Sequence, residues 1–393
     1  MTLPKPLDEA AAARALADLA EKSPDWALDA ETREFLGSVF AASPYLRDLA
    51  LRDPAFARRT LEEAPDALLD EVLAGLILDL EEPALRRRIR QTKAKAALLI
   101  AIADLSGRWG IEQVTEALTR LADSLLTACV NWLLLDTPKL VDLDPQNPAK
   151  DCGYTVLAMG KHGAYELNYS SDVDLIVLYD STTPKLKPGA EPSDVFVRLT
   201  RRLVALMQEP DENGYGFRVD LRLRPDPRAT QIAISMEAAG VYYESMGQNW
   251  ERAAMIKARP AAGDLGLGEE FLSRLKPYVW RKYLDFAAIA DVQSMKRQIH
   301  AVRGHGEIAV FGHNIKLGRG GIREIEFFVQ TQQLIAGGRN LTLRGRRTLE
   351  MLDALAAAQW ITPIAAAELK QDYRYLRTIE HRIQMVADEQ THT

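Results

Sequence analysis

A short apolar run that begins with two aspartates limits the fold of this chain more than any other feature of the sequence. Residues 172–179 read Asp-Val-Asp-Leu-Ile-Val-Leu-Tyr, a pattern typical of a strand inside a sheet. Because side chains alternate along a strand, Asp172 and Asp174 share one face, and the apolar residues of the other face point into the core. Two carboxylates side by side repel each other, and burying them without a cation is costly. A bound Mg²⁺ or Mn²⁺ removes that cost, because hard cations prefer carboxylate oxygens.

A second alternating run, residues 217–224, supplies a third carboxylate. Read as a strand, this run places Asp220 on one face with three arginines and its apolar residues on the other face. One carboxylate among guanidinium groups suits a metal ligand flanked by phosphate-binding side chains. The alternative is an exposed strand face held together by salt bridges.

A glycine and a lysine precede the aspartate pair. A strand, then Gly160-Lys161, a loop and Asp-x-Asp on the next strand is the order found in nucleotidyltransferases. Glycine lets the backbone approach a phosphate, and the amides of such a loop can cradle it. Lys161 either supplies a cation to that phosphate or lies at the surface. Ser170 and Ser171 are either phosphate donors or turn residues.

These groups define one predicted site. Metal binding and catalysis are assigned to the aspartates, and phosphate or nucleotide binding to the polar residues around them. The catalytic and metal-binding set is Asp172, Asp174 and Asp220; the phosphate- or nucleotide-binding set is Gly160, Lys161, Ser170, Ser171, Arg222 and Arg224.

The remaining sequence predicts helices on both sides of a small sheet. Residues 1–135 are rich in alanine, leucine, arginine and glutamate, and apolar residues recur at helical spacing from Ile111 to Trp132. Further helices are expected at 194–208, 286–303 and 322–335. Strands are expected at 154–159, 172–179 and 217–224. The fold class is α+β, with a nucleotidyltransferase mixed-sheet core and large helical N-terminal and C-terminal regions.

Three regions are expected along the chain. Residues 1–150 form a helical N-terminal region, residues 151–260 the nucleotidyltransferase catalytic core, and residues 261–393 a helical domain that completes the cleft. The last residues carry no turn or stop signal, so we expect this domain to be truncated at its C-terminus. Within it, Glu326 is a candidate partner for an arginine or a metal. Charged residues between 251 and 259 either line the cleft or form the rim of a helix.

Charge and apolar patterning exclude several classes of protein. The net charge is -6, whereas a nucleic-acid-binding domain is usually basic, so we expect no nucleic-acid partner. The N-terminus has no apolar signal segment, and the longest apolar run, residues 96–103, is far shorter than the ~18 residues of a membrane span. We therefore expect a cytoplasmic protein with no membrane partner and two buried or half-buried, reduced thiols, Cys129 and Cys152. The basic residues between 86 and 95 are expected to form a solvated helix face, or else a docking surface for an acidic partner or phosphate.

Five stretches resemble one known family. They are residues 160–176, 218–225, 242–259, 319–330 and 380–384. Together they are highly specific and similar to the signature of glutamine synthetase adenylyltransferases, a two-headed family with a nucleotidyltransferase domain, of the polymerase-β-like type, in each half. A long helical segment precedes the motif, and Gly321-Ile-Arg-Glu-Ile-Glu-Phe327 resembles the version in the first half of the family. The chain also ends before a second head.

The resemblance implies a function and its partners. The first half of the family removes AMP from a tyrosine of adenylylated glutamine synthetase by phosphorolysis, using inorganic phosphate and releasing ADP, under the control of the PII signalling protein. The resemblance also implies Mg²⁺ or Mn²⁺ as the cofactor. Two alternatives remain: adenylyl transfer from ATP to glutamine synthetase, and a non-catalytic nucleotide-sensing regulatory module.

Overall fold

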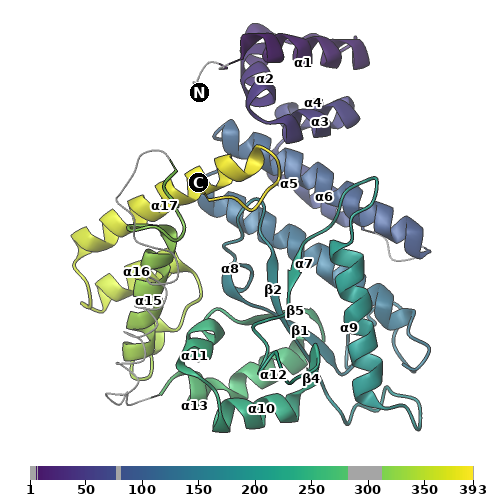
Figure 1. Cartoon of the computed structure of the whole chain (residues 1–393), viewed down its shortest axis with the longest axis vertical. Coiled ribbons are helices and arrows are strands. Elements are labelled where there is room, and N and C mark those ends of the chain that lie inside the picture. The colour runs from purple at the N-terminus through teal and green to yellow at the C-terminus, as the bar shows by residue number, and fades with distance from the viewer. Residues whose placement is uncertain (1–5, 7, 77–80, 282–311, 393) are drawn as a thin grey trace.

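The computed structural model describes residues 6, 8–76, 81–281 and 312–392 of the chain. The helix expected at 286–303 lies outside the described residues. Within them, helices surround one small mixed sheet, so the α+β class is confirmed (Figure 1).

The N-terminal region is helical, as its composition predicts. Short capped helices come first, and two long ones follow: α1 (Glu9–Lys22), α2 (Ala30–Ala42), α3 (Pro44–Arg52), α4 (Pro54–Glu62), α5 (Pro65–Ala74), α6 (Glu82–Leu105) and α7 (Ile111–Leu135). The side chains of Asp29, Ser43 and Asp53 cap the helices that follow them by accepting a backbone N–H. Proline stands at the first turn of α3, α4 and α5, where its missing N–H costs nothing.

Helix α7 is long and apolar enough to cross a membrane by length and composition alone. In the fold, however, 67% of its most apolar window is buried inside the protein. Val114, Leu118, Leu121 and Leu125, from the predicted apolar stripe, are all buried. The helix packs against α6, α9 and β5, which is the environment of a core helix.

The sheet is mixed. Its strands are β1 (Tyr154–Ala158), β2 (Val173–Tyr179), β3 (Val219–Asp220), β4 (Ala233–Ser235) and β5 (Arg259–Gly263). Strand β1 runs antiparallel to both β2 and β5, whereas β2 runs parallel to β3 and to β4. The spatial order is β3-β2-β1-β5, with β4 also beside β2. Strands β3 and β4 therefore occupy two successive stretches along one edge of β2.

Helices cover the two faces of the sheet. Val173, Leu175 and Val177 of β2 pack into one core with α6, α7 and α9 (Pro192–Gln208). Ile176 and Leu178 face the other way. Their core includes residues of α10 (Met236–Ser245), α11 (Asn249–Met255), α12 (Leu265–Arg274) and α13 (Lys276–Val279). Alternation places Asp174 on this second face, at the start of β2.

The C-terminal helices form a core of their own. They are α15 (Ile322–Ala336), the 3₁₀ turn η1 (Leu341–Leu343), α16 (Thr348–Ala357) and α17 (Pro363–Met385). Helix α15 confirms the prediction for 322–335. Figure 1 shows α17 running toward the loop around the short helix α8 (Gly160–Gly163). The division at residues 150 and 260 stays a prediction.

The strand predicted over residues 217–224 is wrong in its length. Pairing with β2 covers only Val219 and Asp220. The chain then turns, because the backbone N–H of Arg222 donates to the side chain of Asp220 at 2.8 Å and Pro225 follows three residues later. The alternation of charged and apolar residues continues to Arg224, although the strand itself ends at Asp220.

The solvated helix face predicted for the basic cluster on α6 is also wrong in part. Arg87 and Arg88 are exposed, but Arg90 and Lys93 are buried. Arg90 donates to the carbonyl oxygens of Glu209 and Gly214. A helix turns by 100° per residue, so consecutive basic residues cannot all lie on one face.

Candidate metal centre

The start of β2 and the end of β3 bring three carboxylates together. Asp174 pairs with Asp220 across the parallel ladder, and Asp172 precedes Asp174 on the same face of the chain. One oxygen from each of the three side chains lies within 4.8 Å of the others. All three residues are half-buried, so the acid triad of Asp172, Asp174 and Asp220 is open to solvent. The structure therefore brings these three residues together, as the sequence predicts.

The three carboxylates are held differently. The Gln390 side-chain amide donates to Asp172 at 2.9 Å. Burial, together with the charges of Asp172 and Asp220, raises the pKa of Asp174 from 3.8 to about 7. Burial acts in the same direction on Asp220, but the hydrogen bonds from Arg222 outweigh it and leave the pKa of Asp220 below its ordinary value. The charge of Asp174 is thus less well compensated than that of Asp220.

The donor set fits a hard divalent cation. Each ligand on offer is a carboxylate oxygen, the donor type that magnesium and manganese prefer. Among the described residues, neither Asp172 nor Asp174 forms an ion pair with a lysine or arginine. The residues present therefore fit a metal that Asp172, Asp174 and Asp220 would hold.

Gly160 lies directly against the triad. Its φ is +53°, a conformation that favours glycine, and a Cβ at this position would lie 2.9 Å from Oδ2 of Asp174. A Cβ on Gly163 would come within 2.0 Å of the carbonyl oxygen of Lys257. These two glycines let α8 pack tightly between the metal centre and β5. Space for a phosphate beside Gly160 stays a prediction.

Lys161 is placed away from solvent. Its ammonium lies 3.0 and 3.1 Å from the two oxygens of Glu380 on α17, and its side chain is only 12% exposed. Burial lowers the pKa of Lys161 to about 8, although Glu380 opposes the shift. The alternative of a surface lysine is therefore wrong. Its role as a phosphate-binding cation stays a prediction, but an ion pair already engages it.

Ser170 and Ser171 are buried within a turn. The Ser170 backbone N–H donates to Gln384 at 2.9 Å, and its hydroxyl accepts from Arg218 at 2.9 Å. Ser171 donates its backbone N–H to the carbonyl of Asn168. These contacts show both serines as turn residues, and phosphate binding by them stays a prediction.

Arg222 and Arg224 do not share a strand face with Asp220. Arg222 folds back onto the Asp220 carboxylate at 2.8 Å, while 84% of its side chain is exposed. Arg224 donates to the carbonyl oxygens of Leu221 and Pro227. Arg222 is thus at the metal centre and Arg224 braces the turn behind it. Phosphate binding by either residue stays a prediction.

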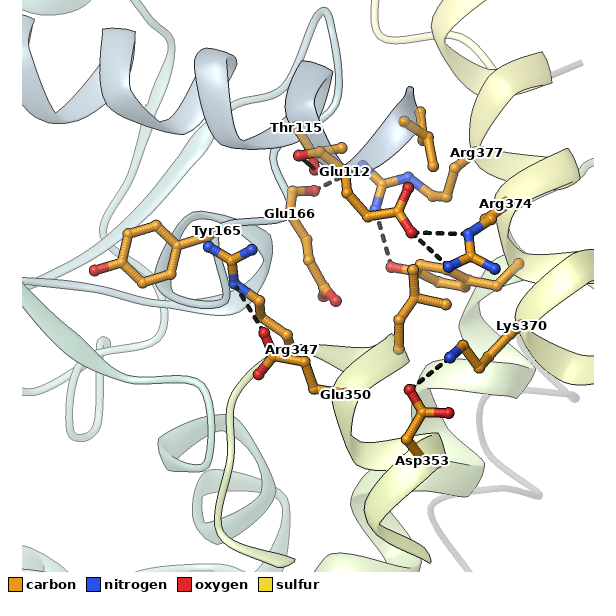
Figure 2. Close-up of a pocket in the computed structure, with 13 residues that line it drawn as sticks. Glu112, Thr115, Tyr165, Glu166, Arg347, Glu350, Asp353, Lys370, Arg374 and Arg377 are labelled. Carbon is orange, nitrogen blue, oxygen red and sulfur yellow. Dashed lines mark hydrogen bonds and ion pairs between the residues drawn. The ribbon is translucent and has the colours of Figure 1, made fainter. Parts of the chain in front are cut away.

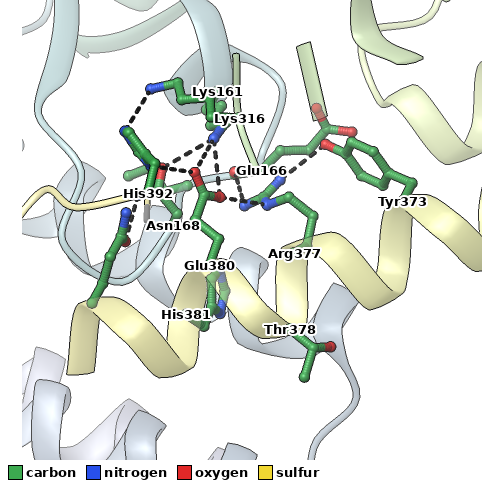
Figure 3. Close-up of polar contacts among 12 residues, drawn as sticks. Lys161, Glu166, Asn168, Lys316, Tyr373, Arg377, Thr378, Glu380, His381 and His392 are labelled. Atoms are coloured by element: carbon green, nitrogen blue, oxygen red, sulfur yellow. Dashed lines mark hydrogen bonds and ion pairs between the residues drawn. The ribbon is translucent and has the colours of Figure 1, made fainter. Parts of the chain in front are cut away.

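A buried ion network joins the Gly160 loop to the C-terminal helices (Figure 3). Glu380 lies between Lys161 and Arg377, with the Arg377 guanidinium 3.1 Å away. In the same region, Lys257 pairs with Glu166 at 3.0 Å and with Glu326 at 3.3 Å. We call these six residues the ion network: Lys161, Glu166, Lys257, Glu326, Arg377 and Glu380.

The ion network bears on two further predictions, the partner of Glu326 and the location of the charged residues between 251 and 259. Glu326 does have a buried partner, Lys257, whereas the prediction named an arginine or a metal. Glu251, Arg252, Lys257 and Arg259 are all buried, so they do not form an exposed rim. The sequence alone assigns no role to Glu380, although this residue begins the family-like stretch 380–384. Its partner Lys161 lies 219 residues away, and no local pattern predicts such a contact.

A separate cavity of about 220 Å³ lies between α7, α16 and α17 (Figure 2). Its lining includes Tyr165 and Glu166 but no residue of the acid triad. The cations around it are paired with acids: Arg347 with Glu116, Lys370 with Asp353, and Arg374 with Glu112. The cavity is therefore distinct from the metal centre. Both expected thiols, Cys129 and Cys152, are buried elsewhere in the core.

A mixed sheet that presents Asp-x-Asp on one strand and a third aspartate on the parallel neighbour, behind a glycine-bearing loop, defines the nucleotidyltransferase class. Within it, the chain belongs to the glutamate-ammonia ligase adenylyltransferase family, whose model matches residues 33–274. The model described as GlnD PII-uridylyltransferase matches residues 293–393.

Curated relatives agree with the family assignment. A bifunctional glutamine synthetase adenylyltransferase/adenylyl-removing enzyme of Brucella melitensis is 53% identical over 98% of this chain. Proteins of the same name from Mesorhizobium japonicum and Rhizobium meliloti are 51% and 52% identical over 99% and 93% of the chain. The matches cover 41%, 41% and 38% of these relatives, so the chain spans about two fifths of their length.

Proposed function

We propose that this chain removes the adenylyl group from a tyrosine of adenylylated glutamine synthetase by metal-dependent phosphorolysis, releasing ADP. The observation that carries the proposal is the convergence of Asp172, Asp174 and Asp220 within 4.8 Å on neighbouring strands. The family match and the names of the relatives supply the substrate and the type of group transferred.

The reaction exchanges one phosphorus–oxygen bond for another. An oxygen of inorganic phosphate attacks the adenylyl phosphorus, the bond to the tyrosine oxygen breaks, and the phenolate that leaves takes up a proton. Phosphate is already anionic near neutral pH, so the site needs no strong general base. Asp172, Asp174 and Asp220 would hold the metal, Mg²⁺ or Mn²⁺. When bound, it neutralises charge on the phosphoryl oxygens and on the leaving phenolate.

Two features of the chain favour removal over addition. The chain carries the long helical region before the motif and the Arg-Glu-Ile-Glu sequence in α15 that resemble the adenylyl-removing half. The three regions 1–150, 151–260 and 261–393 would then be a helical module, the catalytic core and a helical domain that closes over it.

The partners follow from the same family. Adenylylated glutamine synthetase is the proposed substrate in the cytoplasm, and inorganic phosphate and ADP are the small molecules. The PII-uridylyltransferase description of the match over 293–393 supports a link to the PII signalling protein.

One incubation tests the proposal. The chain is mixed with adenylylated glutamine synthetase, inorganic phosphate and MgCl₂, and the nucleotides are separated by chromatography. We expect ADP to form in step with loss of the adenylyl group, measured by mass spectrometry of the tyrosine peptide. Release of AMP instead would mean hydrolysis and contradict phosphorolysis.

A second incubation separates the alternatives. Unmodified glutamine synthetase and ATP replace the adenylylated substrate, and we expect no adenylylated tyrosine peptide. Its formation would assign the adding activity. If neither incubation gives product although the chain binds Mn²⁺ and ADP, the regulatory-module alternative holds.

A further inference from the structure

A protein cation that is free to donate to an anionic oxygen favours phosphoryl chemistry at three carboxylates. The expected candidates are already engaged. Lys161 is paired with Glu380, Arg222 is folded onto Asp220, and Arg224 donates to backbone carbonyls. The loop before α15 and the segment after α17 bring another cation to this place.

Lys316 is linked to the acid triad through the segment after α17. The backbone N–H of Ile315 donates to the carbonyl of His392 at 3.0 Å, and the Lys316 ammonium lies 3.4 Å from Nε2 of His392. Two residues before His392, Gln390 donates to Asp172. One short segment therefore contacts both a residue of the acid triad and Lys316. Figure 3 shows Lys316, Lys161 and His392 grouped around Glu380.

Lys316 has no carboxylate partner among the described residues. Its ammonium forms no ion pair within 4 Å there, and its side chain is half-buried rather than sealed in the core. A lysine in this position can donate a hydrogen bond to an anionic oxygen without first breaking an ion pair.

We propose that Lys316 binds a phosphoryl oxygen at the metal centre, either of the adenylyl group or of the inorganic phosphate that attacks it. This assignment rests on the proposed phosphorolysis for the identity of the anion. A phosphate there would lie between the carboxylate-bound metal and the Lys316 ammonium. Such a subsite favours phosphate over neutral water as the attacking group.

The test measures binding, so it does not depend on turnover. The wild-type chain and the K316Q and K316R variants are titrated with MnCl₂, and the Mn²⁺-loaded proteins then with ADP, AMP and inorganic phosphate, by calorimetry. The matched control is R323Q, which removes one positive charge from an exposed residue in the first turn of α15. We expect K316Q to weaken ADP binding roughly ten- to hundredfold. K316R should keep most of the affinity, and R323Q should match the wild type.

The pattern across ligands identifies the oxygen. Weaker binding of AMP alone places Lys316 on the adenylyl phosphate, and weaker binding of inorganic phosphate alone places it on the attacking group. Unchanged ADP affinity in K316Q overturns the inference, as does a wild-type chain that binds Mn²⁺ but no ADP. If Lys316 had only a structural role, K316Q would lower the melting temperature without changing ADP affinity in the folded protein.

A second measurement uses the unaltered chain. Acetylation of Lys316 is followed by mass spectrometry with and without Mn²⁺ and ADP, with the exposed Lys187 as the internal reference. Protection of Lys316 but not of Lys187 supports the inference, and equal rates overturn it. If ADP binds through Lys316 but adenylylated glutamine synthetase releases no ADP, the inference stands and the proposed function fails.

Discussion

The acid triad and the ion network use the same kinds of side chain with opposite results. In the ion network, Glu380 lies 3.0 Å from Lys161 and 3.1 Å from Arg377, and its pKa is lowered to about 2, because these cations outweigh the effect of burial. In the triad, burial and the charges of two further carboxylates raise the pKa of Asp174 to about 7. The local balance of charge, rather than burial alone, separates the two.

The difference assigns different roles to the two regions. A carboxylate whose charge is matched within the protein contributes to stability and leaves nothing for a ligand to complete. Carboxylates left unmatched are a cost to the fold, and proteins retain such costs at functional sites. Substitutions in the two regions should therefore affect different measurements.

The largest expected effect is on turnover. Replacing Asp172 and Asp174 together with asparagine should reduce ADP release at least about a thousandfold, because several kcal/mol of charge stabilisation depend on the bound metal. The melting temperature should stay the same or rise, because the substitutions remove repulsion. Wild-type turnover in this double variant would reject the triad as the catalytic site.

The ion network should respond in stability instead. E380Q leaves Lys161 and Arg377 without their carboxylate and should cost about 3–5 kcal/mol of unfolding free energy in urea titrations. K161M should lower the unfolding free energy by less, because Glu380 still forms its ion pair with Arg377. Equal costs for the two variants would mean that Glu380 does not join the two cations as described.

Acid should weaken the ion network before any substitution is made. The pKa of Glu380 is about 2 in the folded protein and ordinarily 4.5, so the unfolded chain takes up its proton first as the pH falls. The stability that Glu380 contributes is present above about pH 4.5 and is lost as the pH falls toward 2, in total roughly 3 kcal/mol. Unfolding free energy measured across this window should fall less steeply in E380Q. Identical slopes in both proteins would contradict the assigned shift.

Metal should stabilise the triad and leave the ion network unaffected. At a hundredfold excess over its dissociation constant, a ligand of the folded state adds about 2.7 kcal/mol. MnCl₂ should therefore raise the melting temperature of the wild type and of K161M alike. The double aspartate variant should show no rise, and an equal rise there would place the metal elsewhere.

The smallest effect is expected at Arg222. Its guanidinium pairs with Asp220 but is 84% exposed, so R222A should change stability by less than about 1 kcal/mol. Removing this cation should also make Mn²⁺ bind somewhat more tightly in calorimetric titrations. Looser Mn²⁺ binding would show instead that Arg222 orients Asp220 for the metal.

Local pattern was enough to predict much of the metal centre. The alternation in residues 172–179 predicted β2 and the shared face of Asp172 and Asp174, because these depend only on strand geometry. The same reasoning predicted too long a strand for β3. A hydrogen bond from the Arg222 backbone to Asp220 ends this strand, although charged and apolar residues go on alternating to residue 224.

Contacts between distant segments could not be predicted in this way. Nothing in the sequence near Lys161 indicates Glu380, and nothing near Lys316 indicates His392. Burial of Arg90 likewise depends on carbonyl groups more than a hundred residues away. These contacts arise from how α6, α15 and α17 pack, which one sequence does not specify by local pattern.

Gly160 limits how this enzyme family could be redesigned. The nearest obstacle to any added methyl group is the carboxylate of Asp174 itself, at 2.9 Å, and the backbone there already has a φ that other residues adopt only with strain. An alanine at 160 would thus shift an oxygen of the proposed metal site together with the main chain. Redesign should begin at other residues around the acid triad and leave this position untouched.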